Sequence, residues 1–204
     1  VDKESLGKLL LKTAYLEGDF VLRSGKRSKY YLDKYLFETD PQVLRGLVYE
    51  MAMMIRNELA AGAPCARLAA PELGGVVLRA SLSLELGLPL LLVRKQTKDY
   101  GTSKRIEGRF EVGETVAVVE DIVTSGGAAI QAAEALREAG LVVHDLYCVV
   151  DREEGGREAA AAAGLVLRPL FASGEEGIAP RAQEGPFVAL CVEKWLEERL
   201  CHLL

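Results

Sequence analysis

Apolar side chains recur along the chain at two spacings, one typical of helices and the other of strands. The helical spacing covers residues 3–16 and, after a proline that suits a helix start, residues 41–62. Between these two helices, the apolar runs 20–22 and 30–32 flank a polar loop of Gly, Ser, Lys and Arg, which predicts a β-hairpin. The first part of the chain is therefore expected to form a helix, a hairpin and a second, longer helix.

Beyond residue 62, strands and helices alternate. Strands that alternate with helices of ordinary length form a mostly parallel sheet flanked by helices on both faces. The expected fold class is therefore α/β, with a small N-terminal unit over residues 1–40 and a core over residues 41–204. The predicted strands of the core cover residues 67–70, 89–93, 115–120, 141–150 and 166–171, and its later helices cover 75–86, 127–139, 157–163 and a stretch from 188.

Composition narrows the class of protein further. Half of the 204 residues are apolar, which is enough for a sizeable core, and the net charge of −5 gives no general attraction to a polyanion. Nucleic acid is therefore not an expected partner. No stretch approaches the roughly 20 apolar residues that span a bilayer, no export signal is evident, and the four cysteines share no CxxC spacing. We expect a cytoplasmic protein without a membrane segment.

The segment that joins the strand 115–120 to the helix 127–139 carries the clearest chemical signal. Its strand runs into two adjacent carboxylates, and a Thr-Ser-Gly-Gly turn then opens the helix. Small residues let backbone N–H groups close around a phosphate, and the helix N-terminus adds positive potential. The two acids would repel a bare phosphate, so they need a different ligand group. The vicinal hydroxyls of a ribose can donate hydrogen bonds to them. The candidate residues are Glu120, Asp121, Ile122, Val123, Thr124, Ser125, Gly126, Gly127 and Ala128.

This segment predicts a site for a phosphorylated ribose. The alternative is an ordinary strand-to-helix turn in which Ser and Thr cap the helix and Gly allows tight geometry, without any ligand. That alternative does not account for paired acids at a strand end, because two like charges are poorly tolerated there without partners. Dinucleotide and P-loop sites are disfavoured because the glycine patterns of both are missing.

The segment 116–128 resembles the binding motif for phosphoribosyl pyrophosphate (PRPP) in the type I phosphoribosyltransferases, which has apolar residues, two acids, an apolar pair, Thr and small residues in this order. Two further stretches, 20–31 and 94–101, resemble the orotate-specific members of that family. The resemblance spans most of the chain and implies the type I phosphoribosyltransferase fold, with residues 1–40 as an N-terminal hood. It also implies transfer of the 5-phosphoribosyl group from PRPP to orotate, which gives orotidine 5′-monophosphate and pyrophosphate in pyrimidine synthesis.

Residues 94–107 form a polar stretch between apolar strands, and a loop of this length inside a compact domain is usually functional. Its cations can offset the charge of a departing pyrophosphate, although they also fit a solvated surface loop. The resemblance implies that Lys98 is catalytic and that this mobile loop closes over the neighbouring subunit's active site in a homodimer. Tyr100 stands where many bacterial relatives have His. Because a phenol carries no charge near pH 7, Lys98 is the residue expected to act through its charge. The cations of the loop are Arg94, Lys95, Lys98, Lys104 and Arg105.

The resemblance also assigns the binding site of the base. Arg152 and Thr124 are expected to contact orotate, which carries a carboxylate. Neighbouring residues of a strand point to opposite faces, so only one of two adjacent tyrosines in the hood can line the pocket. Arg152 could instead be a surface salt-bridge partner of Glu153 or Glu154. The hood residues expected to cover the base are Arg23, Lys26, Tyr30 and Tyr31.

The turn 70–75, which follows another strand, is assigned by the resemblance to pyrophosphate, although its residues fit ordinary turn chemistry equally well. Glu72 in this turn must face either a cation or a water bound to Mg²⁺. The Mg²⁺ is expected to arrive with PRPP and can reach Asp121 through a water, so no metal site made by the protein alone is expected. His144 and His202 lack the spacing of metal ligands.

Two other functions use the same ribose phosphate motif. A purine or uracil phosphoribosyltransferase is disfavoured by the stretch 20–31 and by Arg152, which suit an acidic pyrimidine. A non-enzymatic regulator that senses the ligand and binds nucleic acid is disfavoured by the loop lysines, by the negative net charge and by the lack of a DNA-binding helix pair.

Overall fold

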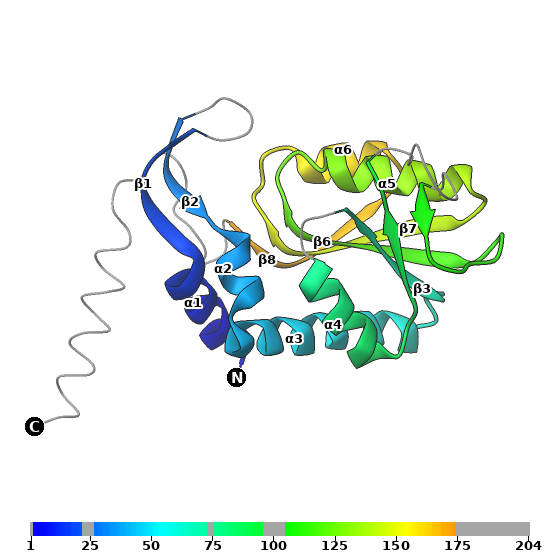
Figure 1. The fold of residues 1–204 in the computed structure, drawn as a ribbon, viewed down its shortest axis with the longest axis horizontal. Helices are drawn as coiled ribbons and strands as arrows, with labels where there is room; N and C mark the ends of the chain where they lie inside the picture. The colour runs from blue at the N-terminus through cyan, green and yellow to red at the C-terminus, as the bar shows by residue number, and fades with distance from the viewer. Residues whose placement is uncertain (1, 22–26, 73–75, 96–104, 174–204) are drawn as a thin grey trace, which may run out of the picture.

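The computed structural model describes residues 2–21, 27–72, 76–95 and 105–173 (Figure 1). Most of the predicted loop 94–107 and the predicted final helix from residue 188 lie outside the described residues. Within the described part, every helix is too short or too polar to cross a membrane.

The N-terminal part contains three helices and a hairpin. Asp40 begins the longest helix, α3, because its carboxylate accepts hydrogen bonds from the backbone N–H groups of Gln42 and Val43. The short helix α2 was not predicted, because its six residues are too few to show a helical period. These elements are α1 (Lys3–Ala14), β1 (Tyr15–Val21), β2 (Arg27–Leu32), α2 (Lys34–Thr39) and α3 (Pro41–Ala60).

The hairpin begins earlier than the sequence pattern predicted. The predicted helix 3–16 ends at Ala14, and Tyr15 already has extended backbone angles of φ −82° and ψ 123°. Tyr15 pairs with Leu32 of β2, and its ring stacks on that of Tyr30 with the centroids 5.5 Å apart. Cross-strand pairs of aromatic rings stabilise a hairpin, so the pairing with β2 overrides the helical period at the end of α1.

Among the described residues, six strands form the main sheet in the order β5-β4-β3-β6-β7-β8. All neighbouring strands are parallel except β5, which is antiparallel to β4, so the predicted mostly parallel sheet is confirmed. The two-residue β5 was not predicted, and it takes up the end of the predicted loop 94–107. The strands are β3 (Arg67–Pro71), β4 (Leu90–Val93), β5 (Ile106–Glu107), β6 (Thr115–Val123), β7 (Val142–Asp151) and β8 (Val166–Ala172).

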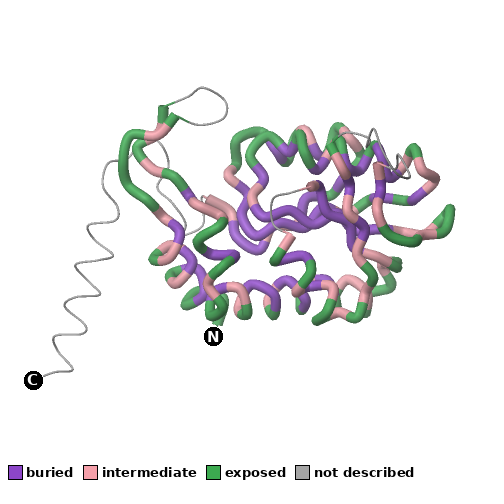
Figure 2. The backbone as a smooth tube through the Cα atoms, viewed as in Figure 1, coloured by how far each residue is buried: buried purple, intermediate pink, exposed green. Residues whose placement is uncertain are grey.

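Helices cover both faces of this sheet, as predicted (Figure 1). Along β6, Ala117 and Val119 share a buried cluster with Leu47 of α3, whereas Val118 shares a second cluster with Leu136 of α5. This alternation follows from the two-residue period of a strand. Figure 2 shows the sheet as a buried layer between the helices. The remaining helices are α4 (Val76–Leu86), beside α3, and α5 (Gly127–Glu138) and α6 (Gly156–Ala162) on the other face.

The hood packs directly against the core through α1 and α2. Leu6 and Leu10 of α1 and Phe37 of α2 belong to the same buried cluster as Leu47 of α3. The contact between α1 and α3 is so close that a Cβ atom at Gly46 would lie 2.6 Å from Cδ1 of Leu6. The hood is therefore held in place beside the sheet, and its boundary at residue 40 stays a prediction.

Candidate active site

The turn between β6 and α5 depends on a glycine in the left-handed conformation. Gly126 has φ 75° and ψ −1°, which residues with a side chain rarely adopt, and a Cβ atom there would lie 3.3 Å from the backbone oxygen of Gly156. Gly126 is the N-cap of α5, and no side chain caps this helix. The alternative of a turn capped by Thr124 or Ser125 is therefore wrong. Both hydroxyl residues are exposed instead, where a ligand can reach them.

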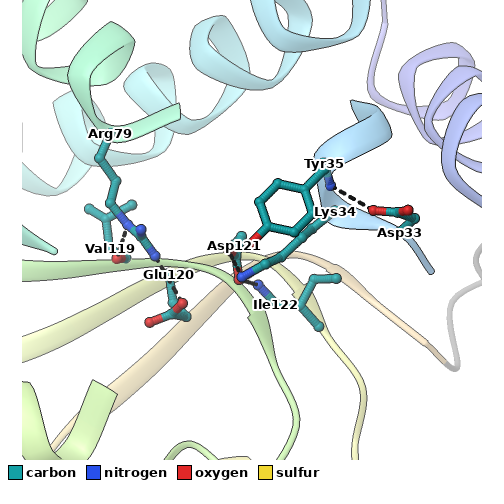
Figure 3. Close-up of polar contacts among 8 residues, drawn as sticks. All are labelled: Asp33, Lys34, Tyr35, Arg79, Val119, Glu120, Asp121 and Ile122. Carbon is teal, nitrogen blue, oxygen red and sulfur yellow. Dashed lines mark hydrogen bonds and ion pairs between the residues drawn. The ribbon is translucent and has the colours of Figure 1, made fainter. Parts of the chain in front are cut away.

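Glu120, near the end of β6, is buried and paired with an arginine from α4 (Figure 3). Its Oε1 accepts a hydrogen bond from Nη2 of Arg79 at 2.9 Å, and Nε of Arg79 donates to the backbone oxygen of Val119 at 2.6 Å. The Arg79 side chain is 0% exposed. Within the described part of the chain, Oε2 of Glu120 and Nη1 of Arg79 have no hydrogen-bond partner. Glu120 is thus fixed at one oxygen and keeps the other as an acceptor.

Asp121 is held by a lysine from the hood. Nζ of Lys34, the first residue of α2, lies 2.8 Å from Oδ2 of Asp121, and Oδ1 accepts the backbone N–H of Ile122 at 2.6 Å. Figure 3 shows Lys34 and Arg79 reaching the two neighbouring carboxylates from two different helices. Each acid therefore has its own cation, which reduces the repulsion between two adjacent buried charges.

The surroundings of the two acids shift the pKa values of Glu120 and Lys34. Burial raises the pKa of Glu120 to about 7, the charge of Asp121 adds to this rise, and Arg79 and Lys34 work against it. Desolvation lowers the pKa of Lys34, but the charge and the hydrogen bond of Asp121, together with the charge of Glu120, raise it overall. Lys34 is therefore charged at neutral pH, whereas Glu120 changes its protonation state near it.

This raised pKa predicts how stability depends on pH. Because the pKa of Glu120 is higher in the folded protein than its ordinary 4.5, the stability it contributes is present at low pH and is lost as pH rises through about 7. Replacing Glu120 by Gln removes this titration. The free energy of unfolding of Glu120→Gln minus that of the wild type is expected to increase between pH 5 and pH 8, as measured by urea denaturation.

A second carboxylate with a large pKa shift, Glu114, does not affect this comparison. The pKa of Glu114 is lowered to about 2 by its hydrogen bond with Arg67, but both proteins contain that pair, so its effect cancels. A difference in unfolding free energy that stays constant from pH 5 to pH 8 would contradict the raised pKa of Glu120.

Arg152, directly after β7, lies at the same edge of the sheet as the end of β6 and faces the hood. Its Nη2 donates to the phenol oxygen of Tyr30 at 3.3 Å, and its guanidinium carbon lies 5.4 Å from the centre of the Tyr30 ring. The same Nη2 lies 3.0 Å from Oε1 of Glu154, so the surface ion pair considered from the sequence is also present. Arg152 therefore joins the hood to the core, and its contact with the base stays a prediction.

The hairpin separates the two tyrosines that the sequence could not distinguish. Tyr30 faces Arg152 and stacks on Tyr15, whereas Tyr31 is exposed and its ring lies 5.5 Å from that of Phe20. Tyr30 is therefore the tyrosine that points toward the core.

On the other side of the segment 116–128, Glu72 faces a cation. This is one of the two possibilities left open by the sequence. Its Oε1 lies 3.5 Å from Nη2 of Arg94, and Nε of Arg94 lies 3.2 Å from Oε1 of Glu107. A hollow beside α5 is lined by three cations of the predicted loop together with Ala128 of the PRPP segment; the cations are Arg94, Lys95 and Arg105. Positive charge thus lies next to the start of α5.

Several predicted site residues are not placed by the structure. Arg23, Lys26, Lys98 and Tyr100 lie outside the described residues, so their roles stay predictions. Conversely, sequence reasoning missed Lys34 and Arg79. Arg79 left a signal, because it is a charged residue within an apolar run of its helix. Lys34 left none, because a charged residue after a strand is ordinary.

Comparisons with known proteins show the family of the chain. The family model of the phosphoribosyl transferase domain matches residues 47–164. A curated orotate phosphoribosyltransferase of Methanocella arvoryzae is 46% identical over 175 residues, which cover 86% of this chain and 97% of that protein.

Solved structures show the same relationship. The orotate phosphoribosyltransferase of Aeropyrum pernix superposes with a TM-score of 0.69 at 32% identity, over 82% of this chain and 93% of that one. Leishmania donovani UMP synthase gives a TM-score of 0.73 at 27% identity, over 84% of this chain and 36% of that chain. With its sheet, its acid pair and the turn into α5, this chain therefore belongs to the orotate phosphoribosyltransferase family of phosphoribosyltransferases.

Proposed function

We propose that the protein transfers the 5-phosphoribosyl group of PRPP to orotate and releases orotidine 5′-monophosphate and pyrophosphate. The observation that carries this proposal is the buried acid pair near the end of β6, which the turn 124–126 joins to the N-terminus of α5, where no side chain caps the helix. An acceptor pair beside a phosphate cradle matches a ribose 5-phosphate. The family membership supports PRPP as the donor and orotate as the acceptor.

Each part of the substrates has a proposed partner among the described residues. The ribose hydroxyls donate to Asp121 and to Glu120, whose buried Oε2 has no hydrogen-bond partner among the described residues. The 5-phosphate accepts hydrogen bonds from the turn 124–128, and Arg152 pairs with the carboxylate of orotate under the hood. As the bond from the anomeric carbon to pyrophosphate breaks and the bond to the orotate nitrogen forms, positive charge develops on the ribose, in an oxocarbenium-like transition state. The protein acts mainly by positioning these groups and balancing their charges.

Magnesium enters this proposal together with PRPP. Mg²⁺ is commonly bound by one or two carboxylates plus substrate phosphates, and the described residues contain no group of three or more His, Cys, Asp or Glu side chains that could hold a metal alone. Asp121 is the carboxylate that would hold the ion that arrives with PRPP. The ion would offset the negative charge of the pyrophosphate.

A spectrophotometric assay tests the proposed function. Orotate is expected to be consumed in the presence of PRPP and Mg²⁺, while uracil, hypoxanthine and adenine are consumed at least about a hundredfold more slowly, because they lack the carboxylate that Arg152 pairs with. Equal or faster consumption of any of these three bases would reject orotate as the acceptor.

Cytoplasmic location is part of the same proposal, and it is supported by the free thiols of Cys65 and Cys148.

The proposal includes a homodimer in which the loop with Lys98 acts on the neighbouring subunit. It rests on the family resemblance and on the cations Arg94, Lys95 and Arg105 at the described ends of that loop. In an equal mixture of Lys98→Ala and Asp121→Asn subunits, half of the dimers are mixed, and each mixed dimer has one intact site. Activity is therefore expected to recover to about a quarter of the wild-type value. Mass spectrometry verifies that the subunits have exchanged. If activity then does not recover, the loop does not act across the interface.

A further inference from the structure

Lys34 is anchored more firmly than a surface lysine. The backbone N–H of Asp33 donates to the oxygen of Ala14 at the end of α1, and the Asp33 carboxylate accepts the N–H of Tyr35 at 3.0 Å as the N-cap of α2. Leu32, at the end of β2, is buried in the main core. The start of the Lys34 side chain is therefore fixed by the hairpin, by α1 and by the cap of α2.

The position of Lys34 does not benefit its own helix. A positive charge in the first turn of a helix opposes the helix dipole. The first turn of α2 has no acidic residue, and the carboxylate at this end of the helix is that of the N-cap, Asp33. The compensating contact is Asp121, which is 87 positions away in the sequence and lies 2.8 Å from Nζ. Nζ of Lys34 also lies 5.5 Å from the centre of the Tyr35 ring in the hood, but its ion pair is with Asp121, in the proposed ribose site.

The pair is asymmetric in exposure. The Asp121 side chain is 3% exposed and that of Lys34 is 26% exposed. Arg79 is committed to Glu120 and to the backbone oxygen of Val119, so among the described residues Lys34 is the cation that pairs with Asp121. Without Lys34, a buried carboxylate would lose its counter-ion and one of the two hydrogen bonds that fix its orientation.

We propose that Lys34 is a positioning residue for PRPP, which holds the Asp121 carboxylate in the orientation that receives the ribose hydroxyls and links the placement of the hood to the ribose site. This inference rests on the proposed function, because it takes PRPP as the ligand of Asp121. Lys34 acts through Asp121, and orotate, which is expected beside Arg152, is affected less than PRPP.

Equilibrium binding tests this role without catalysis. In calorimetric titrations with PRPP and Mg²⁺, Lys34→Met is expected to raise the Kd for PRPP by about tenfold, and Lys34→Arg by no more than about threefold because it keeps the cation. The matched control is Lys29→Met, which removes an exposed hood lysine paired with Asp19 on the surface, and its Kd should stay within about twofold. Equal Kd values for Lys34→Met and Lys29→Met would overturn the proposal.

A double-mutant cycle shows whether Lys34 acts through Asp121. In an Asp121→Asn background, Lys34→Met is expected to change the Kd for PRPP by less than about twofold, because the group it positions is already altered. The double variant carries no unpaired buried charge at this point, so it folds even if Lys34→Met alone does not. A full tenfold effect in both backgrounds would show that Lys34 does not act through Asp121 and would overturn the proposal.

Steady-state kinetics give an independent readout. Lys34→Met should raise the KM for PRPP by about tenfold and the KM for orotate by less than about threefold. A wild-type protein that binds PRPP but does not consume orotate would refute the proposed function, while the Kd values would still decide the role of Lys34. Equal increases in the KM for PRPP and the KM for orotate would contradict the proposed role of Lys34 and indicate a general loss of structure.

Discussion

Replacing Arg79 by Met is expected to lower the free energy of unfolding by about 3–5 kcal/mol at pH 8, because removing one partner of a buried ion pair leaves the other charge without compensation. Arg79 is fully buried and holds both Glu120 and the backbone oxygen of Val119. The loss should be smaller at pH 5, since the raised pKa of Glu120 makes it neutral there. Urea denaturation at the two pH values measures both losses.

Two matched variants identify the cause of this loss. The double variant Arg79→Met, Glu120→Gln removes both charges and is expected to be more stable than Arg79→Met at pH 8, because an uncharged pair of similar volume is tolerated in a core. Arg56→Met breaks the exposed pair of Arg56 with Glu85 and should cost less than about 1 kcal/mol. An Arg79→Met protein that is as stable as Arg56→Met would show that the buried pair has no special weight.

The acid pair and the turn into α5 could be predicted because they are contiguous in the sequence. A strand, two acids, small residues and a helix start specify their own geometry locally, and the left-handed Gly126 provides the turn that the pattern required. The parallel order of the strands was also predictable, because it follows from the alternation of strands and helices. The acid pair and the turn depend on neighbours within a window of about 11–18 residues, which a reader of the sequence sees together.

The cations that hold the acids could not be predicted in the same way. Arg79 and Lys34 lie 41 and 87 positions from the acids they contact, and only the packing of α4 and α2 beside β6 brings them there. The early start of β1 has the same origin. The pairing of Tyr15 with β2, and not the helical period of the preceding residues, determines its backbone conformation. The local pattern therefore predicted the acid pair and its turn, whereas tertiary packing determines which cations hold the acids.

The second large effect is expected at Arg152. Arg152→Ala should lower kcat/KM for orotate by about a hundredfold, because the carboxylate of orotate loses its cation in a largely buried position. The Kd for PRPP should change by less than about threefold, since the residues proposed to bind its ribose phosphate belong to β6, to the turn after it and to the start of α5. Steady-state kinetics with varied orotate, together with calorimetry for PRPP, measure the two quantities.

Neighbouring residues decide whether Arg152 acts on the base or only in its surface ion pair. Glu154→Gln removes the pair at 3.0 Å and leaves Arg152 with Tyr30, so kcat/KM for orotate should stay within about threefold of the wild type. Tyr30→Phe removes the phenol that accepts from Arg152 and should reduce it by about three- to tenfold, whereas Tyr31→Phe, on the exposed side, should not. If Arg152→Ala and Glu154→Gln reduce kcat/KM equally, Arg152 serves the ion pair and not the base, and the acceptor carboxylate must be held by another cation.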